Sequence, residues 1–255
     1  MIVIAVTAQK GGVGKTATTA AIGAGLHRAG KRVLSIDIDP QANLSAQLGA
    51  GQRVTIYDVL TDRASAESAA QETPQGAIIA ADARLAERGI LTGRGAEYRL
   101  RDALAPLKGK FDFCLIDTPP TLGALTISAM TAADHLLLPA KADRFSVSAL
   151  QEIADTIQTV RAQTNKRLTV AGVLVTMFAR RTTVNRVMLD ELREQAEQLG
   201  FRVLDPPIRR AVAVEEAQLG GSVFDSRNGA AEDYQQIIDQ ILQITKGAEN
   251  GNIQG

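Results

Sequence analysis

The sequence has little cysteine and little histidine. Of its 255 residues, one is cysteine and two are histidine. An internal disulfide and a cysteine-rich metal site are therefore excluded, and a reducing compartment fits best. Neither His27 nor His135 has a second histidine, a cysteine pair or an acidic cluster close to it in the sequence. Cys114 lies within an apolar run, which indicates a packing role and not a nucleophile.

The chain also lacks net charge and long apolar runs. Its 28 basic residues balance its 28 acidic ones, so affinity for a polyanion would have to come from a local patch. No apolar run reaches the roughly 20 residues that a membrane-spanning helix requires. The opening run 2–6 has no basic leader, and we interpret it as a buried strand and not as a signal peptide. These features predict a cytoplasmic protein.

Composition and length favour a globular core. With 45% hydrophobic residues, the 255-residue chain is long enough for one substantial core, and open α/β folds of this size often form a single domain. Residues 1–246 are therefore predicted to form one domain. The polar, glycine-rich segment 247–255 is predicted to be a flexible tail.

Short apolar runs alternate with helical stretches along the chain. Such runs are typical of strands buried on both faces of a parallel sheet. They occupy residues 2–6, 32–36, 77–80, 111–116, 135–139, 169–177 and, more weakly, 201–204. Helices are expected at residues 16–29, 100–107, 147–162, 184–199 and 230–246, with a short helix and a surface loop in 61–76. The alternation predicts a doubly wound α/β fold: a mostly parallel sheet of about seven strands, with helices on both faces.

A glycine-rich segment follows the first apolar run. It reads Gln9-Lys10-Gly11-Gly12-Val13-Gly14-Lys15-Thr16 and leads into a predicted helix. Glycines let the backbone curl so that successive N–H groups point at phosphate oxygens, and the helix N-terminus adds its positive dipole end. In this motif the lysine, here Lys15, reaches the β- and γ-phosphates, and the hydroxyl of Thr16 ligates magnesium. An ordinary glycine-rich turn is the alternative. The strand–loop–helix context favours a site for ATP and Mg²⁺.

Carboxylates follow two other predicted strands. Asp117 comes directly after run 111–116, and Asp37 and Asp39 follow run 32–36. Ligands of open α/β sheets bind beyond the carboxyl ends of the strands, so Asp117 is placed where a magnesium shell requires a carboxylate. For Asp37 or Asp39 alone, capping of a turn is an alternative. Three acidic residues at strand ends beside one phosphate loop favour a joint role.

Several segments resemble the ParA/MinD family of ATPases, which carries a deviant Walker A box. The segment Lys10-Gly-Gly-Val-Gly-Lys15-Thr16 resembles that box, marked by the extra lysine. The stretches 35–43 (SIDIDPQAN) and 114–120 (CLIDTPP) resemble the second box and Walker B. Residues 133–139 and 216–217 resemble later landmarks of the ParA/Soj branch, so the resemblance extends over nearly all of residues 1–245.

The resemblance implies a dimer that closes around ATP, with Lys10 of each subunit reaching the phosphates held by the other. It also implies that Asp39 positions or activates the attacking water. The implied catalytic residues are Lys10, Lys15 and Asp39; the implied magnesium residues are Thr16, Asp37 and Asp117. The expected nucleotide contacts are Lys10, Gly11, Gly12, Val13, Gly14, Lys15, Thr16, Ala17 and Asp117, with Met177, Pro207 and Arg209 near adenine.

The chain departs from the common family pattern at a few positions. Ala8 stands where asparagine is frequent, Ala17 where a second threonine is usual, and Ala42 where glycine is common. The Ala17 position keeps its backbone N–H but loses a hydroxyl. Where relatives often read Pro-Arg-Asn-Val-Arg, this chain reads Arg209-Arg-Ala-Val-Ala213.

ParA-type dimers bind DNA non-specifically and respond to a ParB-type protein at a centromere-like site, so the resemblance implies both partners. Residues 161–210 carry ten basic and five acidic residues, a net charge of +5 in a neutral chain. This unevenness suits non-specific phosphate binding, although a solvated basic surface is the alternative. The expected DNA contacts are Arg180, Arg181, Arg186 and Arg210.

Rival functions on the same fold predict different features. A membrane-associated ATPase of the MinD type would need a basic amphipathic tail, whereas Glu232, Asp233 and Asp239 make the last helix acidic. Stable membrane association is therefore not expected. An iron–sulfur reductase would need cluster cysteines that one cysteine cannot supply. A small-molecule ligase remains a third alternative. The favoured hypothesis is a nucleoid-associated DNA-partitioning ATPase.

Overall fold

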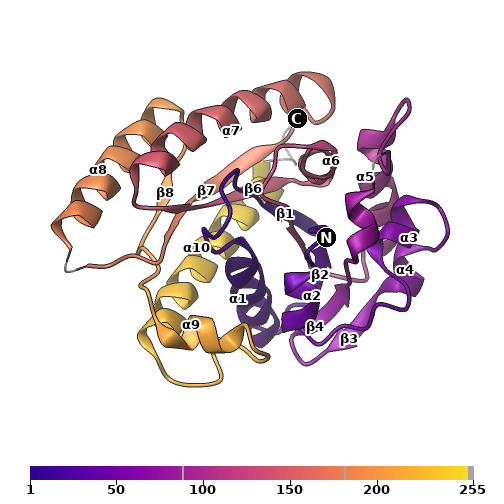
Figure 1. Cartoon of the computed structure of the whole chain (residues 1–255), viewed down its shortest axis with the longest axis horizontal. Coiled ribbons are helices and arrows are strands. Elements are labelled where there is room, and N and C mark those ends of the chain that lie inside the picture. The colour runs from indigo at the N-terminus through magenta and orange to yellow at the C-terminus, as the bar shows by residue number, and fades with distance from the viewer. Residues whose placement is uncertain (88, 181, 252–255) are drawn as a thin grey trace.

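One eight-stranded sheet forms the centre of the protein. The computed structural model describes residues 1–87, 89–180 and 182–251. Its strands are β1 (Ile2–Val6), β2 (Val33–Asp37), β3 (Gln71–Thr73), β4 (Gly76–Ile79), β5 (Phe113–Asp117), β6 (His135–Lys141), β7 (Thr169–Thr176) and β8 (Val203–Leu204). They lie in the order β3-β4-β2-β5-β1-β6-β7-β8 (Figure 1). All neighbouring pairs are parallel except β3 with β4. The predicted mostly parallel, doubly wound fold is confirmed.

The strand that the sequence pattern missed is β3. It lies in segment 61–76, which was expected to contain a short helix and a loop. The short helix is present as α4 (Ala66–Ala69), and β3 follows it as an antiparallel edge strand. Its residues are polar and only partly buried, so the apolar signal of a buried strand is absent.

The remaining helices are α1 (Lys15–Arg28), α2 (Asn43–Gln47), α3 (Ile56–Leu60), α5 (Arg99–Leu104), α6 (Ala124–Ala132), α7 (Arg144–Gln163), α8 (Thr183–Gln198), α9 (Val212–Ala217) and α10 (Gly229–Gly251). Short 3₁₀ turns occupy Ala83–Ala86, Ala96–Tyr98 and Ala105–Leu107. The five longer helices predicted from the sequence are therefore confirmed. Helix α6 was not predicted; its sequence ALTISAMTA has no polar face to mark a helical period.

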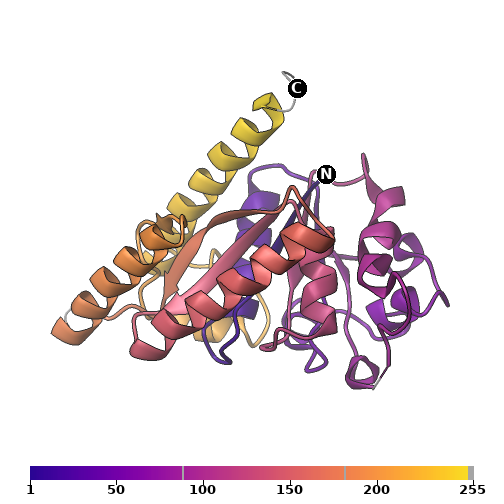
Figure 2. The same ribbon diagram turned by 90° about the horizontal axis from the view of Figure 1, so that it is seen from above.

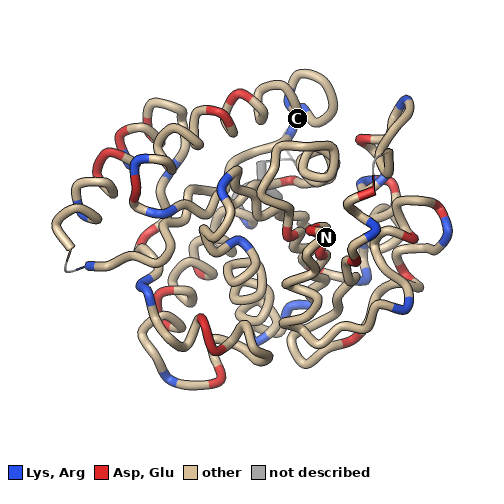
Figure 3. Tube along the Cα trace, in the orientation of Figure 1, with Lys and Arg blue, Asp and Glu red and all other residues tan. Residues whose placement is uncertain are grey.

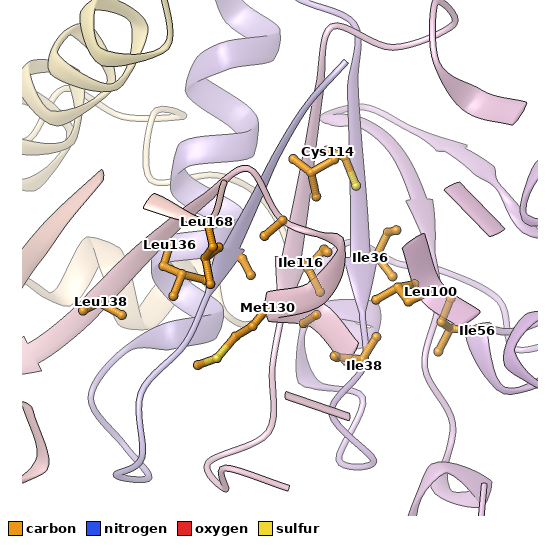
Figure 4. Packing of buried hydrophobic residues seen from close by; sticks show 14 of the residues in the cluster. Ile36, Ile38, Ile56, Leu100, Cys114, Ile116, Met130, Leu136, Leu138 and Leu168 are labelled. Carbon is orange, nitrogen blue, oxygen red and sulfur yellow. The ribbon is translucent and has the colours of Figure 1, made fainter. Parts of the chain in front are cut away.

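The side chains of successive strand residues pack into two apolar cores, one on each face of the sheet. Val3 and Ala5 of β1 pack with residues of α5, α6, α7 and α8, and Figure 4 shows part of this core around Met130 and Ile116. Ile4 and Val6 point the other way and pack with α1 and α10. Because a strand has a period of two residues, one apolar run supplies both faces.

Helix α10 packs on the same face of the sheet as α1, and its C-terminal end extends beyond the rest of the fold (Figure 2). It continues to Gly251, past residue 246 where the predicted domain ends, so the tail predicted to be flexible begins as helix. Residues 252–255 lie outside the described residues. The division into a domain and a tail otherwise stays a prediction. No helix in the described part of the chain is both long and apolar enough to cross a membrane.

Candidate functional site

The phosphate loop connects the end of β1 to the start of α1. Gly12 and Gly14 adopt the left-handed backbone conformation, with φ of 67° and 80°, which glycine tolerates without a steric penalty. Helix α1 begins at Lys15, whose side chain is buried and whose Nζ donates to the carbonyl oxygen of Lys10 at 3.4 Å. The predicted strand–loop–helix context is therefore present.

The start of α1 is joined to the end of β5 by hydroxyl groups. Thr16 Oγ1 donates to Asp117 Oδ2 at 2.7 Å, and Thr19 Oγ1 lies 3.3 Å from Asp117 Oδ1. Thr19 also donates to the carbonyl oxygen of Lys15 at 3.0 Å. The structure thus brings the two predicted magnesium ligands Thr16 and Asp117 into direct contact, and it adds Thr19, which the sequence analysis did not select.

Asp37 and Asp39 occupy the loop after β2 but have different surroundings. Asp37 is fully buried: Oδ1 accepts from the backbone N–H of Asp39, and Oδ2 accepts from the N–H and hydroxyl of Ser45. Asp39 Oδ1 accepts from the N–H of Gln41 at 3.0 Å, and the side chain lines the same cleft as the phosphate loop. Asp37 therefore positions the loop, and Asp39 faces the cleft. Their predicted roles toward magnesium and water stay predictions.

Burial changes the pKa values of the titratable groups at this site. Burial raises the pKa of Asp117 to about 8, with a further contribution from the charge of Asp37. Burial likewise raises the pKa of Asp37 to about 6. The pKa of Lys15 is lowered by burial, although Asp117 and Asp39 oppose that shift. A cation bound beside Asp117 would favour its ionised form, because an opposite charge lowers the pKa of a carboxyl group.

Lys10 is held within its own chain. Its Nζ lies 2.7 Å from Asp143 Oδ2 and 5.0 Å from the ring centroid of Phe145, at the start of α7. Asp143 also caps α7 by accepting from the N–H of Ser146. Burial alone would raise the pKa of Asp143, but hydrogen bonds from Lys10 and Ser146 outweigh it and lower the pKa. The predicted reach of Lys10 across a dimer stays a prediction, and in this structure Asp143 is its partner.

A cleft opens beside the phosphate loop. It has a volume of about 440 Å³ and is lined by the loop and by Asp39, Gln47, Pro120, Met177 and Gln218. A smaller neighbouring pocket has Met177, Ile208, Arg209 and Ala211 in its lining. Met177 has a φ of 52°, which is strained for a residue with a side chain and is found most often near functional sites. Pro207 is buried and contributes to neither lining among the described residues.

Arg209 has a side-chain partner that the sequence analysis did not foresee. Its Nε and Nη2 each lie 2.7 Å from an oxygen of Asp233 on α10, and Arg180 Nη2 lies 3.7 Å from the same carboxylate. The Asp233 side chain is 1% exposed. Of the three acids that make the last helix acidic, Asp233 therefore adds no charge to its surface, because its carboxylate is buried and paired.

The basic residues of segment 161–210 do not form one surface. Lys166 and Arg167 precede β7, whereas Arg180 follows it, and an eight-residue strand separates such positions by about 26 Å. Acidic and basic residues are interspersed along α8 (Figure 3). Of the predicted DNA residues, Arg186 is exposed, Arg180 approaches Asp233, and Arg210 lies 3.8 Å from Glu215 with a 76% exposed side chain. Arg181 lies outside the described residues.

Other residues at the site were missed for identifiable reasons. Asp143 follows the end of β6, and inspection of every strand end would have found it. Thr176 Oγ1 donates to the carbonyl oxygen of Val13 at 2.8 Å and ties the phosphate loop to the end of β7. Asp233 lies between buried Ala230 and Ile237 on the helical face that packs on the core, and a charge at such a position signals a buried ion pair.

The residues present fit a phosphate-bound magnesium ion better than a metal held by protein alone. Among the described residues, no three histidine, cysteine, aspartate or glutamate side chains gather as a metal site. Magnesium in phosphate-transfer sites takes one or two carboxylates and completes its shell with phosphate oxygens and water. Thr16 and Asp117, in contact beside a glycine-rich loop, supply a donor set of that kind.

Comparisons with known proteins agree with this geometry. The family described as AAA domain matches residues 1–170. The chromosome partitioning protein ParA of Caulobacter vibrioides is 38% identical over 252 residues, covering 94% of this chain and 93% of the relative. The sporulation initiation inhibitor protein Soj of Bacillus subtilis is 34% identical over 249 residues, covering 94% and 97%.

A solved structure is also similar over almost the whole chain. It is that of cobyrinic acid a,c-diamide synthase from Mycobacterium smegmatis with a bound ATP analogue and magnesium, at a TM-score of 0.85 and 34% identity, covering 97% of each chain. The P-loop geometry, the sheet order and the extent of the sequence identity lead to one conclusion. The chain belongs to the ParA/Soj family of chromosome partitioning ATPases.

Proposed function

We propose that this protein is an ATP-dependent DNA-partitioning ATPase, in which ATP binding closes a dimer that binds DNA non-specifically. Slow, magnesium-dependent hydrolysis, stimulated by a ParB-type centromere-binding protein, then releases the DNA. The observation that carries the proposal is the Thr16–Asp117 contact at 2.7 Å beside a buried Lys15. Membership of the ParA/Soj family supports the proposed cargo.

The proposed nucleotide contacts follow from the loop geometry. Backbone N–H groups of residues 11–17 and the Lys15 ammonium would hold the phosphates, while Met177 and Arg209 flank the side proposed for adenine. Thr16 and Asp117 would hold magnesium, which supplies positive charge for the β- and γ-phosphate oxygens when it is bound. Asp37 orders the loop that carries Asp39, and we assign to Asp39 the orientation of the attacking water.

Lys10 is proposed to act on the nucleotide of the second subunit. A cation supplied by the partner offsets negative charge that develops at the γ-phosphate, as an arginine finger does. Dimer formation would then switch activity on, and hydrolysis would limit the lifetime of the DNA-bound state. For Lys10 to act in this way, its ion pair with Asp143 has to open.

The decisive experiment measures ATP hydrolysis with and without DNA in the wild type and in Lys10→Ala and Asp39→Ala. We expect both variants to lose the stimulated rate, with ATP binding retained by Asp39→Ala. Lys110→Ala is the matched control, because Lys110 is a surface lysine paired with Glu67 away from the cleft. Equal, DNA-independent rates in all four proteins would refute the proposed mechanism.

DNA contact is proposed for the exposed arginines Arg186 and Arg210, with Arg180 as a weaker candidate because it approaches Asp233. Replacing Arg210 with alanine should weaken binding to every DNA sequence by a similar factor. It should also reduce the slope of log affinity against log salt by about one unit. Unchanged binding across several salt concentrations would remove Arg210 from the interface.

Two rival functions give different outcomes in simple assays. A MinD-like protein would bind anionic vesicles in the presence of ATP, whereas we expect no such binding, because Glu232 and Asp239 leave α10 acidic. The similar synthase structure keeps a small-molecule ligase as the second rival. A ligase would hydrolyse ATP only with a carboxylic acid substrate and would ignore DNA, whereas we expect DNA and the ParB-type partner to control turnover.

A further inference from the structure

The segment on the proposed adenine side is attached to α10 by a buried ion pair. Asp233 accepts three hydrogen bonds from Arg209: from the backbone N–H at 3.1 Å, from Nε at 2.7 Å and from Nη2 at 2.7 Å. Its side chain is 1% exposed, and that of Arg209 is 36% exposed. A guanidinium that donates from two nitrogens to one carboxylate fixes the orientation of both groups.

Space for the guanidinium is provided by the first residue of α10. A Cβ atom built on Gly229 would lie 2.1 Å from Arg209 Nη1 and 2.5 Å from Cζ. Glycine at this position therefore leaves room for the guanidinium of Arg209 beside the first turn of the helix, where it reaches Asp233. The pair occupies a fitted place in the packing and is not a chance surface contact.

The segment held by this pair borders the end of β7. The N–H of Phe178 donates to the carbonyl oxygen of Ile208 at 2.9 Å. The N–H of Ile208 donates to the carbonyl oxygen of Val175 at 2.8 Å. Ile208 and Arg209 line the pocket that also contains Met177 and Gly14. Residues 208–211 therefore form one wall of the smaller pocket beside Met177, and Asp233 holds that wall through Arg209 without lining the pocket.

We propose that Asp233 is a positioning residue for the nucleotide base, acting through Arg209 to hold the segment 208–211 in its binding conformation. This inference rests on the proposed function, because it assigns the base to the pocket beside Met177. Asp233 lies behind the segment and lines neither the cleft nor the neighbouring pocket, so its effect on affinity is indirect. A segment that is already ordered in the free protein loses less conformational entropy when the ligand binds.

The test compares two ligands that share phosphates but differ in the base. Calorimetric titration with Mg²⁺ present measures the affinities for ATP and for inorganic tripolyphosphate. Asp233→Asn removes the charge and keeps the side-chain shape. We expect it to weaken ATP binding on the order of tenfold, since the segment must then be ordered at the moment of binding, and to leave tripolyphosphate affinity within about twofold.

Matched variants separate positioning from general destabilisation. Asp239→Asn removes an equal charge from the exposed side of α10, where Asp239 accepts a hydrogen bond from Gln235, and should change neither affinity. Arg209→Lys keeps the cation but loses the two-nitrogen contact, so it should weaken ATP binding in the same base-dependent way, by about threefold. In steady-state kinetics the KM for ATP should rise, while kcat stays within about twofold.

A double variant keeps the test informative if Asp233→Asn fails to fold. Arg209→Met with Asp233→Leu removes both charges, so no carboxylate is left buried and unpaired. We expect its thermal stability to recover while ATP binding stays weak. Wild-type ATP affinity in this double variant, or equal losses for ATP and tripolyphosphate in the single variants, would overturn the positioning role.

The outcomes also separate this inference from the proposed function. If the wild type fails to bind Mg-ATP, the ATPase proposal fails and the inference fails with it. If the wild type binds Mg-ATP and Asp233→Asn binds it equally well, only the inference fails. If the wild type binds ATP no more tightly than tripolyphosphate, the base makes no contribution, and the inference is likewise overturned while the phosphate site stands.

Discussion

Two groups of carboxylates lie near each other in this fold, and their partners differ in kind. Asp58 and Asp82 share the guanidinium of Arg84, at 3.0 Å and 2.7 Å. Asp37 and Asp117 accept hydrogen bonds from hydroxyl and backbone groups, which carry no charge. One residue, Ser45, connects the regions: its hydroxyl donates to Asp37 and accepts from the N–H of Ala81, next to Asp82.

The electrostatic consequences are opposite. Burial alone would raise the pKa of Asp58 and of Asp82, but hydrogen bonds from Arg84 and Thr55 outweigh it and lower both pKa values. Burial raises the pKa of Asp117 to about 8 and that of Asp37 to about 6. A buried carboxylate that forms no ion pair and has a raised pKa is a candidate for a functional site. The comparison suggests that the phosphate-loop region is organised for a cation from solution.

The largest effect should come from removing the Asp117 charge. Asp117→Asn should reduce magnesium-dependent ATP hydrolysis by about 100-fold or more, because the amide cannot stabilise the cation that offsets phosphate charge. Phosphate release under saturating ATP measures the effect. Asp102→Asn is the control, since Asp102 is an exposed acid paired with its neighbour Arg101. A less than tenfold loss would place Asp117 outside the reacting machinery.

The second prediction removes the cation that Asp58 and Asp82 share. Arg84→Met should lower the free energy of unfolding by about 2 kcal/mol, because two mostly buried carboxylates lose their cation; the partial exposure of Arg84 limits the cost. ATP hydrolysis should be unchanged. Urea denaturation measures the loss, and Arg101→Met should cost less than about 0.5 kcal/mol. A destabilisation no larger than that control would mean that Arg84 does not hold this region.

The third prediction concerns pH. The pKa values of Asp58 and Asp82 are lowered from 3.8 in the folded protein, so their stabilising contribution is present above that value. It is lost as the pH falls through the folded pKa values. The stability difference between the wild type and Arg84→Met should therefore shrink by about 1 kcal/mol between pH 7 and pH 3. A difference that stays constant across this range would contradict the ion-pair account.

The smallest effect should come from Asp143, whose ion pair with Lys10 is about one-third exposed on each side. Asp143→Asn keeps the cap of α7, because asparagine caps as well as aspartate, but it frees Lys10. Without Asp143, Lys10 no longer has to leave an ion pair before it reaches the nucleotide of the second subunit. Exposed pairs contribute less than about 1 kcal/mol, so the ATP concentration for half-maximal DNA-stimulated hydrolysis should fall only about twofold. Asp155→Asn, on the same helix, is the control. A rise in that concentration would mean that Asp143 assists Lys10 and does not restrain it.

The sequence predicted features that depend on local patterns. The phosphate loop was found because its glycine spacing is continuous in the chain, and seven of the eight strands were found because they are short apolar runs. Strand β3 escaped because its residues are polar and its stability comes from pairing with β4. Local pattern therefore identified the centre of the sheet better than its edge.

Partners brought together by tertiary structure were the main omission. The pairs Lys10–Asp143 and Arg209–Asp233 join residues far apart in the sequence, and one sequence carries no direct signal of which charges meet. For the same reason, the net charge of segment 161–210 did not predict a surface patch, since Arg167 and Arg180 lie at opposite ends of the eight-residue strand β7. To predict which charges pair in space, the three-dimensional fold has to be known.

Thermal unfolding with and without Mg-ATP tests the central comparison most directly. Asp117→Asn should raise the Tm of the ligand-free protein by about 2–4 °C, because burial of the Asp117 carboxylate outweighs the attraction of the nearby Lys15. Saturating Mg-ATP should stabilise the wild type markedly and this variant little. A ligand-free variant less stable than the wild type, with full stabilisation by Mg-ATP, would contradict the account.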